Sequence, residues 1–94
     1  MEVARFNVQN MLFNYLECRS KGKTMTFAEA SAMKLYSTKA AVDVADDAIQ
    51  IHGGNGYMQE YKVEGLYRDA RIMRIYAGTD EMHIRAIARD LLSR

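Results

Sequence analysis

Hydrophobic positions recur every three or four residues along most of the chain, which is the spacing of amphipathic helices. Over residues 2–20 the apolar positions are Ala4, Val8, Met11, Tyr15 and Cys18, widened by Phe6, Leu12, Phe13 and Leu16. No Ser, Thr, Asp or Asn stands before this stretch to cap a helix. We therefore expect a helix over residues 2–20 whose uncapped start resembles the interior of a longer helix.

A capping box predicts where the second helix begins. Glu29 follows Thr26 by three residues, so each side chain can accept a hydrogen bond from the other residue's backbone N–H. The helix is expected over residues 27–51, with a stripe of mostly small side chains at Ala30, Met33, Ser37, Ala40, Ala41, Val44, Ala48 and Ile51. The face expected to be exposed to solvent carries Asp43, Asp46 and Asp47. Small residues let neighbouring helices approach closely, so we predict burial on more than one side.

Glycines interrupt the second half of the chain. Three of the six glycines lie within residues 53–56, and a short helix over residues 63–70 follows them. Thr79 is expected to cap a final helix that ends near Leu92. That helix has an apolar face of Met82, Ala86, Ile87 and Leu91. The sequence thus predicts an all-α fold, a bundle of about three main helices that forms one domain over residues 1–94.

Composition narrows the class of protein. The chain is 49% hydrophobic and 27% charged, as globular domains are, and its net charge of +1 gives no general attraction to nucleic acid or anionic membranes. Cys18 is the one cysteine, which excludes a disulfide framework within the chain. No apolar run reaches the roughly 18 residues of a membrane span. We expect an intracellular domain with no nucleic-acid or membrane partner.

The sequence GGNG at residues 53–56 has two interpretations. A third glycine at position 59 would be needed for a dinucleotide-binding motif, and glutamine stands there. The glycines can form a helix C-cap followed by a turn with positive φ, or they can leave backbone N–H groups open to an anionic ligand. His52 and His83 have no partner at metal-ligand spacing, so we assign no metal site.

The second half of the chain resembles the carboxy-terminal part of an acyl-CoA dehydrogenase, a flavoprotein that desaturates acyl-CoA thioesters. The matching motifs are Gln50-x-x-Gly53-Gly54-x-Gly56-Tyr57, Glu60, Arg68-Asp69-Ala70, Gly78-Thr79-x-Glu81 and Ile87-Ala88-Arg89. They occur in order, and the preceding helices fit the same domain. The resemblance implies part of that family's carboxy-terminal four-helix bundle.

The resemblance also implies ligand contacts. The residues expected to contact the FAD of a neighbouring subunit, near its pyrophosphate, are Gln50, Ile51, His52, Gly53 and Gly54. The residues expected to lie against FAD are Thr79, Asp80 and Glu81, and those expected to border acyl-CoA are Ala77 and Gly78. From the residues alone, Asp80 and Glu81 are first-turn partners of the helix dipole. A homo-oligomer and an electron acceptor are implied as partners, in the bacterial cytoplasm or the mitochondrial matrix.

Three positions depart from the family pattern. Lys62 stands where proline is common, and Gly65 stands where a basic residue is common. Ala77 stands where many members place the catalytic glutamate of a Tyr-Glu-Gly-Thr segment, and its methyl group cannot accept a proton. Branches such as isovaleryl-CoA and long-chain dehydrogenases supply the base from an earlier helix, which would precede Met1. We therefore name no catalytic residue.

Two functional hypotheses follow. In the first, the chain is the carboxy-terminal domain of an FAD-dependent acyl-CoA dehydrogenase and is inactive in isolation. In the second, it is a non-catalytic helical interaction or oligomerisation module derived from such an enzyme. The absence of a carboxylate at Ala77 and the departures at Lys62 and Gly65 favour the second hypothesis, and the retained glycine and Ala-Gly-Thr-Asp-Glu segments favour the first.

Overall fold

The computed structural model describes residues 1–93, which form four α-helices and one short 3-10 helix without any strand. The elements are α1 (Glu2–Ser20), α2 (Phe27–His52), η1 (Gly53–Tyr57), α3 (Val63–Ile72) and α4 (Asp80–Leu92). The all-α prediction is confirmed, and each expected helix is present with ends within two residues of those predicted. The caps explain this accuracy, because the reciprocal bonds of Thr26 and Glu29 and the Thr79 hydroxyl define two helix starts.

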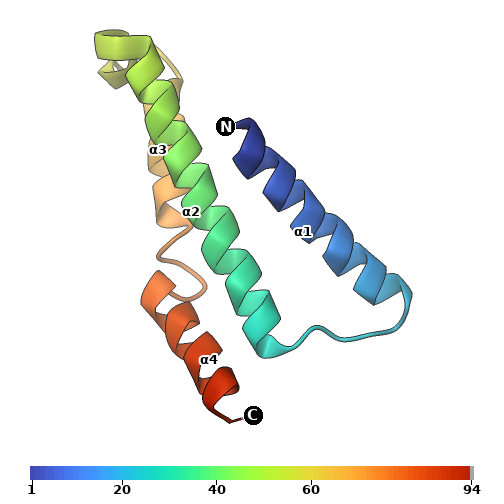
Figure 1. Cartoon of the computed structure of the whole chain (residues 1–94). Coiled ribbons are helices and arrows are strands. Elements are labelled where there is room, and N and C mark those ends of the chain that lie inside the picture. Colours follow the sequence, from blue (N-terminus) through green and yellow to red (C-terminus); the bar gives the residue numbers. More distant parts are fainter. Residues whose placement is uncertain (94) are drawn as a thin grey trace.

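Helix α2 is the centre of the arrangement (Figure 1). α1 runs antiparallel to it on one side. On the other side, α3 lies along the carboxy-terminal half of α2 and α4 lies along its amino-terminal half. Among the described elements, α2 is the only helix that contacts the other three. The prediction that this helix is covered on more than one side is confirmed.

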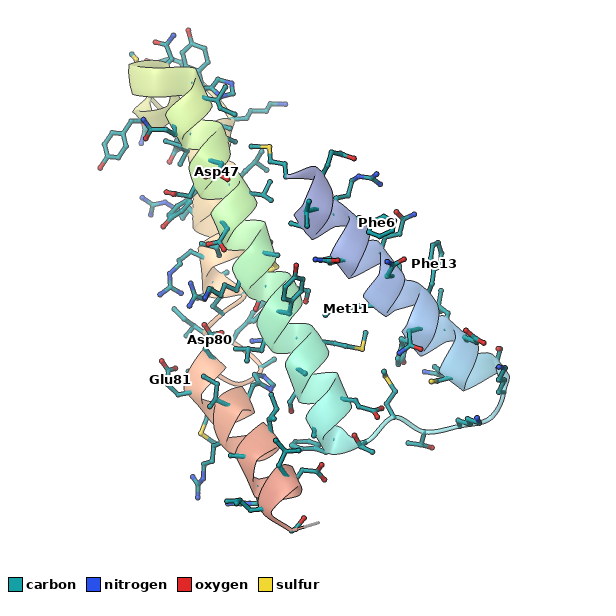
Figure 2. All side chains as sticks on the ribbon, in the orientation of Figure 1. Phe6, Met11, Phe13, Asp47, Asp80 and Glu81 are labelled. Carbon is teal, nitrogen blue, oxygen red and sulfur yellow. The ribbon has the colours of Figure 1, made fainter. Side chains whose placement is uncertain are left out.

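The contact of α2 with α1 is smaller than its contacts with α3 and α4. The predicted stripe of α1 is half-buried against α2, and Figure 2 shows Met11 between the two helices. Phe6 and Phe13 lie on the outer face of α1 and are 59% and 56% exposed. One side-chain hydrogen bond, from Asn7 Nδ2 to the Tyr36 hydroxyl at 2.7 Å, joins the helices. No side-chain cap holds the start of α1, as predicted.

The small-residue stripe of α2 describes the face toward α1, where Ser37, Ala40, Ala41 and Val44 line a shallow groove with α1. The prediction was wrong at the ends of the stripe, because Ala30 and Ile51 are exposed. The face toward α3 and α4 holds most of the buried residues, namely Ala28, Ser31, Thr38 and Val42. Two of these four are polar, so a pattern based on hydrophobicity does not register this second face.

The domain is thin for its length, with extents of 49 × 27 × 18 Å. Its buried hydrophobic residues are Ala28, Ala40, Val42 and Ala70, and within residues 1–93 no large side chain is fully buried. Large apolar side chains on α1 and α3 remain accessible, among them Leu12, Leu16, Leu66 and Ile72. Exposed apolar area on this scale is typical of a surface that contacts another protein segment. None of the helices in residues 1–93 has the length and apolarity required to cross a bilayer.

Candidate functional site

The turn over residues 76–79, between α3 and α4, has an unusual backbone. Ala77 has φ of +52° and Gly78 has φ of +101°. The left-handed region is disfavoured for alanine, because its Cβ approaches the following carbonyl oxygen. The φ of Gly78 favours glycine, and a Cβ there would also displace the His83 ring, whose Nε2 would lie 2.8 Å away. The turn is therefore held in a shape that its sequence alone does not favour.

Side chains from two helices hold the carbonyl groups of this turn. The Lys34 ammonium group, which comes from α2, donates to the Tyr76 carbonyl at 3.1 Å and to the Gly78 carbonyl at 2.8 Å. Nε2 of His83, in α4, lies 3.3 Å from the Ala77 carbonyl oxygen, and a ring that carries its hydrogen on Nε2 donates to this oxygen. Three consecutive carbonyl groups are thus engaged by side chains.

The amide groups of the same turn are free. Within residues 1–93, the N–H groups of Ala77, Gly78 and Thr79 have no hydrogen-bond acceptor. In a planar trans peptide the N–H points away from the C=O of the same unit. Because Lys34 binds the carbonyls of Tyr76 and Gly78, the N–H groups of Ala77 and Thr79 point away from the ammonium group. Exposed amides of this kind bind anions or polarised carbonyl oxygens.

Arg74 and Asp80 close the turn at its base. Nε and Nη2 of Arg74 both lie 2.6 Å from Oδ2 of Asp80, and the Asp80 N–H donates to the Arg74 carbonyl at 3.2 Å. Asp80 is only 9% exposed, and its other carboxylate oxygen has no hydrogen-bond partner in residues 1–93. The sequence predicted Asp80 as a first-turn partner of the helix dipole; it lies in that turn, and it also forms a largely buried ion pair with Arg74. Glu81 is exposed at the first turn of α4, where both acids are labelled in Figure 2.

A groove of about 520 Å³ lies beside the turn. Ala77 and Gly78 line one part of it, and Phe27, Met82 and Arg85 line another. Met82 and Leu91 belong to the predicted apolar face of α4, and their side chains are 53% and 57% exposed. α4 has a neighbour only along α2, so these apolar positions at its edge stay accessible.

The three glycines of residues 53–56 differ in what they require. Gly53 ends α2 with φ of +65°, and its N–H donates to the Gln50 carbonyl. Gly56 is buried, and a Cβ on it would lie 2.6 Å from the Ile49 carbonyl oxygen. Gly54 has neither a positive φ nor any atom within 4 Å of the position a Cβ would take. The expected positive φ is therefore found at only one of the three glycines.

The residues before these glycines are exposed at the end of α2. Gln50 and His52 are accessible, and Ile51 is 76% exposed. His52 Nδ1 lies 2.8 Å from the Ala48 carbonyl oxygen, which holds the ring against its own helix. The segment from Gln50 to Gly54 is therefore exposed at the surface of the chain.

The structure does not bring the two predicted ligand segments together. The Tyr76–Thr79 turn lies at Lys34, whereas the glycines follow Gln50 on the same helix. A helix rises about 1.5 Å per residue, so the interval from Lys34 to Gln50 spans about 24 Å. The segments form two separate sites on α2.

Sequence reasoning missed Lys34, Arg74 and His83. Lys34 lies on the same face of α2 as the buried Ser31 and Thr38, a polar series that has no hydrophobic signal. Arg74 and His83 lie six residues from their partners, across an irregular turn. No group of three or more His, Cys, Asp or Glu side chains within residues 1–93 is placed to hold a metal ion.

These features define a class of protein: an all-α domain that presents, at the Tyr76–Thr79 turn, main-chain amides without an acceptor in residues 1–93. A more specific identification comes from comparison. The chain belongs to the acyl-CoA dehydrogenase family, because the family model described as "Acyl-CoA dehydrogenase, C-terminal domain" matches residues 1–92. The family resemblance of the motifs is thereby confirmed.

Individual relatives agree with this assignment. The chain is 39% identical over 92 residues to a 3-(aryl)acrylate reductase of Clostridium sporogenes, covering 98% of this chain and 23% of the relative. It is 38% identical over 84 residues to the caffeyl-CoA reductase-Etf complex subunit CarC of Acetobacterium woodii, covering 89% and 22%. An acyl-CoA dehydrogenase from Geobacillus kaustophilus superposes with a TM-score of 0.89 at 38% identity, covering 97% and 24%. The chain thus spans about a quarter of the length of these relatives.

Proposed function

We propose that this chain is the carboxy-terminal domain of an FAD-dependent oxidoreductase that acts on the CH–CH bond next to the thioester of an acyl-CoA. The observation that carries the proposal is the Tyr76–Thr79 turn, whose carbonyl groups are engaged and whose amides are free. The family expectation assigns this turn to acyl-CoA at Ala77 and Gly78. Free amides suit a thioester carbonyl, because polarising that oxygen makes the neighbouring α-proton more acidic.

The proposed flavin contact next to this turn involves Thr79, Asp80 and Glu81. At the start of α4 the N–H groups of Thr79 and Glu81 have no acceptor within residues 1–93, and with the positive end of the helix dipole they favour polarised or anionic oxygens. Asp80 is occupied by Arg74, so its contribution is to hold the start of α4 in place. When bound, FAD would supply the hydride acceptor of a desaturation, or the hydride donor of the reverse reduction.

The second proposed flavin contact is the segment Gln50, Ile51, His52, Gly53 and Gly54. Gly54 supports it, because the chain's own geometry explains glycine at positions 53 and 56 but not at position 54. A glycine with open space above it lets a pyrophosphate approach the main chain. Because about 24 Å of α2 separates this segment from the Tyr76–Thr79 turn, we propose that it serves the FAD of a neighbouring subunit in a homo-oligomer.

The reaction requires a base or acid at the α-carbon that this domain does not supply. Ala77 has only a methyl group, and the carboxylate of Asp80 is paired with Arg74. We therefore place the proton-transfer group in another part of the longer enzyme. Some similar proteins are named as reductases and others as dehydrogenases, so the proposal covers both directions of the reaction. An electron-transferring flavoprotein is the proposed electron partner, since one relative is named as a subunit of an Etf complex.

The test compares the full-length enzyme with two valine variants. Gly54→Val places a branched side chain at the proposed flavin contact, and Gly65→Val is the matched control because Gly65 also has open space and no positive φ. The purified wild-type enzyme should contain FAD that acyl-CoA or enoyl-CoA oxidises or reduces. Gly54→Val should lower FAD affinity by about tenfold or more, equivalent to about 1.4 kcal/mol, while the control keeps its flavin.

The 94-residue chain provides the complementary measurement. It should keep its helicity by circular dichroism when Gly54→Val is introduced, and it should neither bind FAD saturably at micromolar concentration nor turn over acyl-CoA. Normal flavin content in full-length Gly54→Val would refute the glycine contact. Flavin-dependent turnover by the isolated chain would refute the need for the rest of the enzyme.

The alternative is a helical oligomerisation module without enzymatic activity. It is favoured by the outer face of α1, where Phe6 and Phe13 are more than half exposed. A full-length protein that purifies without flavin and does not respond to acyl-CoA would favour this alternative.

A further inference from the structure

We propose that Lys34 is a positioning residue: its ammonium group fixes the Tyr76–Thr79 turn so that the N–H groups of Ala77 and Thr79 face the bound thioester. The identity of that ligand rests on the proposed function. The effect of Lys34 on the shape of the turn does not, and it can be measured in the 94-residue chain alone.

The position of Lys34 suits this role. It comes from the amino-terminal third of α2, the helix that all other helices contact. The hydroxyl of the buried Thr38 donates to the Lys34 carbonyl at 2.8 Å. The ammonium group also lies 6.0 Å from the centre of the Tyr76 ring, a distance at which a cation and an aromatic face attract each other. The backbone of Lys34 is thus held in place, and its ammonium group is surrounded by two carbonyl oxygens and an aromatic ring.

The ammonium group binds alternate carbonyls, which determines where the amides point. It lies 3.1 Å from the carbonyl oxygen of Tyr76 and 2.8 Å from that of Gly78. Each carbonyl shares a rigid peptide plane with the next residue's N–H, so fixing the two oxygens directs the N–H groups of Ala77 and Thr79 to the opposite side. One lysine therefore orients two donors.

The backbone between these carbonyls is under strain that the lysine offsets. Ala77 has φ of +52°, a value that an alanine adopts only when its surroundings require it. Hydrogen bonds from a charged donor are about twice as strong as neutral ones. Without the ammonium group, we expect Ala77 to return to a negative φ, which would rotate both peptide planes away from the ligand.

The first arm of the test is NMR of the 94-residue chain. The variants are Lys34→Met, which keeps the length of the side chain without its charge, and Lys34→Arg, which keeps donors and charge. Lys39→Met is the matched control, because Lys39 is exposed on the same helix. Lys34→Met should change the three-bond coupling that reports φ of Ala77 and shift the carbonyl carbon signals of residues 76 and 78. Lys34→Arg should retain most of the wild-type values, and the control should retain all of them.

The second arm measures flavin content, kcat and KM in the full-length enzyme. Misaligned donors lose rate more than binding, so Lys34→Met should lower kcat by about 10- to 100-fold while KM changes less than about threefold. Flavin content should stay normal, and Lys34→Arg should recover most of the lost rate. This split would not arise from general destabilisation, which lowers the amount of active enzyme without rescue by arginine.

Several outcomes would overturn the proposal. Unchanged Ala77 coupling in folded Lys34→Met would show that the lysine does not shape the turn. An altered turn with unchanged kcat would show that its shape does not matter for the reaction. If Lys34→Met does not fold, Lys34→Gln replaces it, and a wild-type turn in that uncharged variant counts against the proposal. A wild-type enzyme without flavin would refute the proposed function, while the NMR arm would still decide the role of Lys34 in the turn.

Discussion

The three glycines of residues 53–56 should respond differently to the same replacement by alanine. At Gly53 the φ of +65° with ψ of −143° is a backbone conformation that residues other than glycine rarely adopt, which costs an alanine about 1–3 kcal/mol, and lost freedom of the unfolded chain returns about 0.4–1 kcal/mol. The net loss for Gly53→Ala is about 1 kcal/mol. At Gly56 the added Cβ would meet the Ile49 carbonyl oxygen at 2.6 Å and the Ile49 Cα at 3.0 Å. These are backbone atoms of α2 that cannot move aside. We therefore expect Gly56→Ala to destabilise the folded chain by about 2 kcal/mol through overpacking.

Gly54→Ala should have the opposite sign. Nothing lies within 4 Å of the added methyl group, and the backbone is outside the left-handed region. The remaining effect is the reduced entropy of the unfolded chain, which stabilises the folded state by about 0.4–1 kcal/mol. The expected order of stability is therefore Gly54→Ala, wild type, Gly53→Ala and Gly56→Ala.

Urea unfolding of the 94-residue chain, followed by circular dichroism, measures this order. Each 1 kcal/mol corresponds to about 4–8 °C in Tm for a domain of this size, so thermal unfolding provides a second measurement. A Gly54→Ala variant as destabilised as Gly56→Ala would refute the reasoning. It would mean that glycine at position 54 is a requirement of the fold, and its assignment to a ligand would lose its support.

Three further results are expected. Asp80→Asn leaves the half-buried Arg74 without its counter-charge and should destabilise the chain by about 2 kcal/mol. This is less than the roughly 3–5 kcal/mol expected for a fully buried pair, because Arg74 is 26% exposed. A urea midpoint equal to that of the wild type would contradict this prediction. Ala77→Gly removes the left-handed strain and should raise stability by about 0.5–1 kcal/mol by the same measurement, whereas a loss would show that the turn is unstrained. The chain should self-associate through the outer face of α1, because full burial of each exposed phenylalanine contributes roughly 1.5–3 kcal/mol. Sedimentation should show a dimer, and the double variant Phe6→Gln, Phe13→Gln should be a monomer. A wild-type monomer at high micromolar concentration would refute this prediction.

Local signals in the sequence were sufficient to locate the helices. Thr26 with Glu29 and Thr79 with the N–H of Met82 are bonds within one turn, so the residues that form them are visible in a short window. The covered faces of α2 were less accessible to such reasoning. Ser31 and Thr38 are buried because α3 and α4 happen to lie over them, and nothing in their chemistry requires burial.

Only those parts of the candidate site that lie within the family motifs were predicted from the sequence. The family resemblance identified the segments at residues 50–54 and 77–81, but it did not indicate what holds them. Lys34 meets the turn from more than forty residues away, a contact that exists only once α2 and α4 have packed. The different requirements of Gly53, Gly54 and Gly56 likewise depend on backbone angles and on the approach of Ile49, which composition does not contain.

The position of α2 as the single helix that touches all others has a consequence for how the domain opens. Loss of α2 removes every contact between α-helices, so its amide protons should exchange with solvent only on global unfolding. α1 is held to α2 by few contacts and begins without a cap, so it can detach while α2, α3 and α4 remain together. Native-state hydrogen exchange should therefore find α1 as a separate unit of low stability. A helix that detaches this readily can also re-dock on the α2 of another copy, which makes α1 the natural element for exchange between chains.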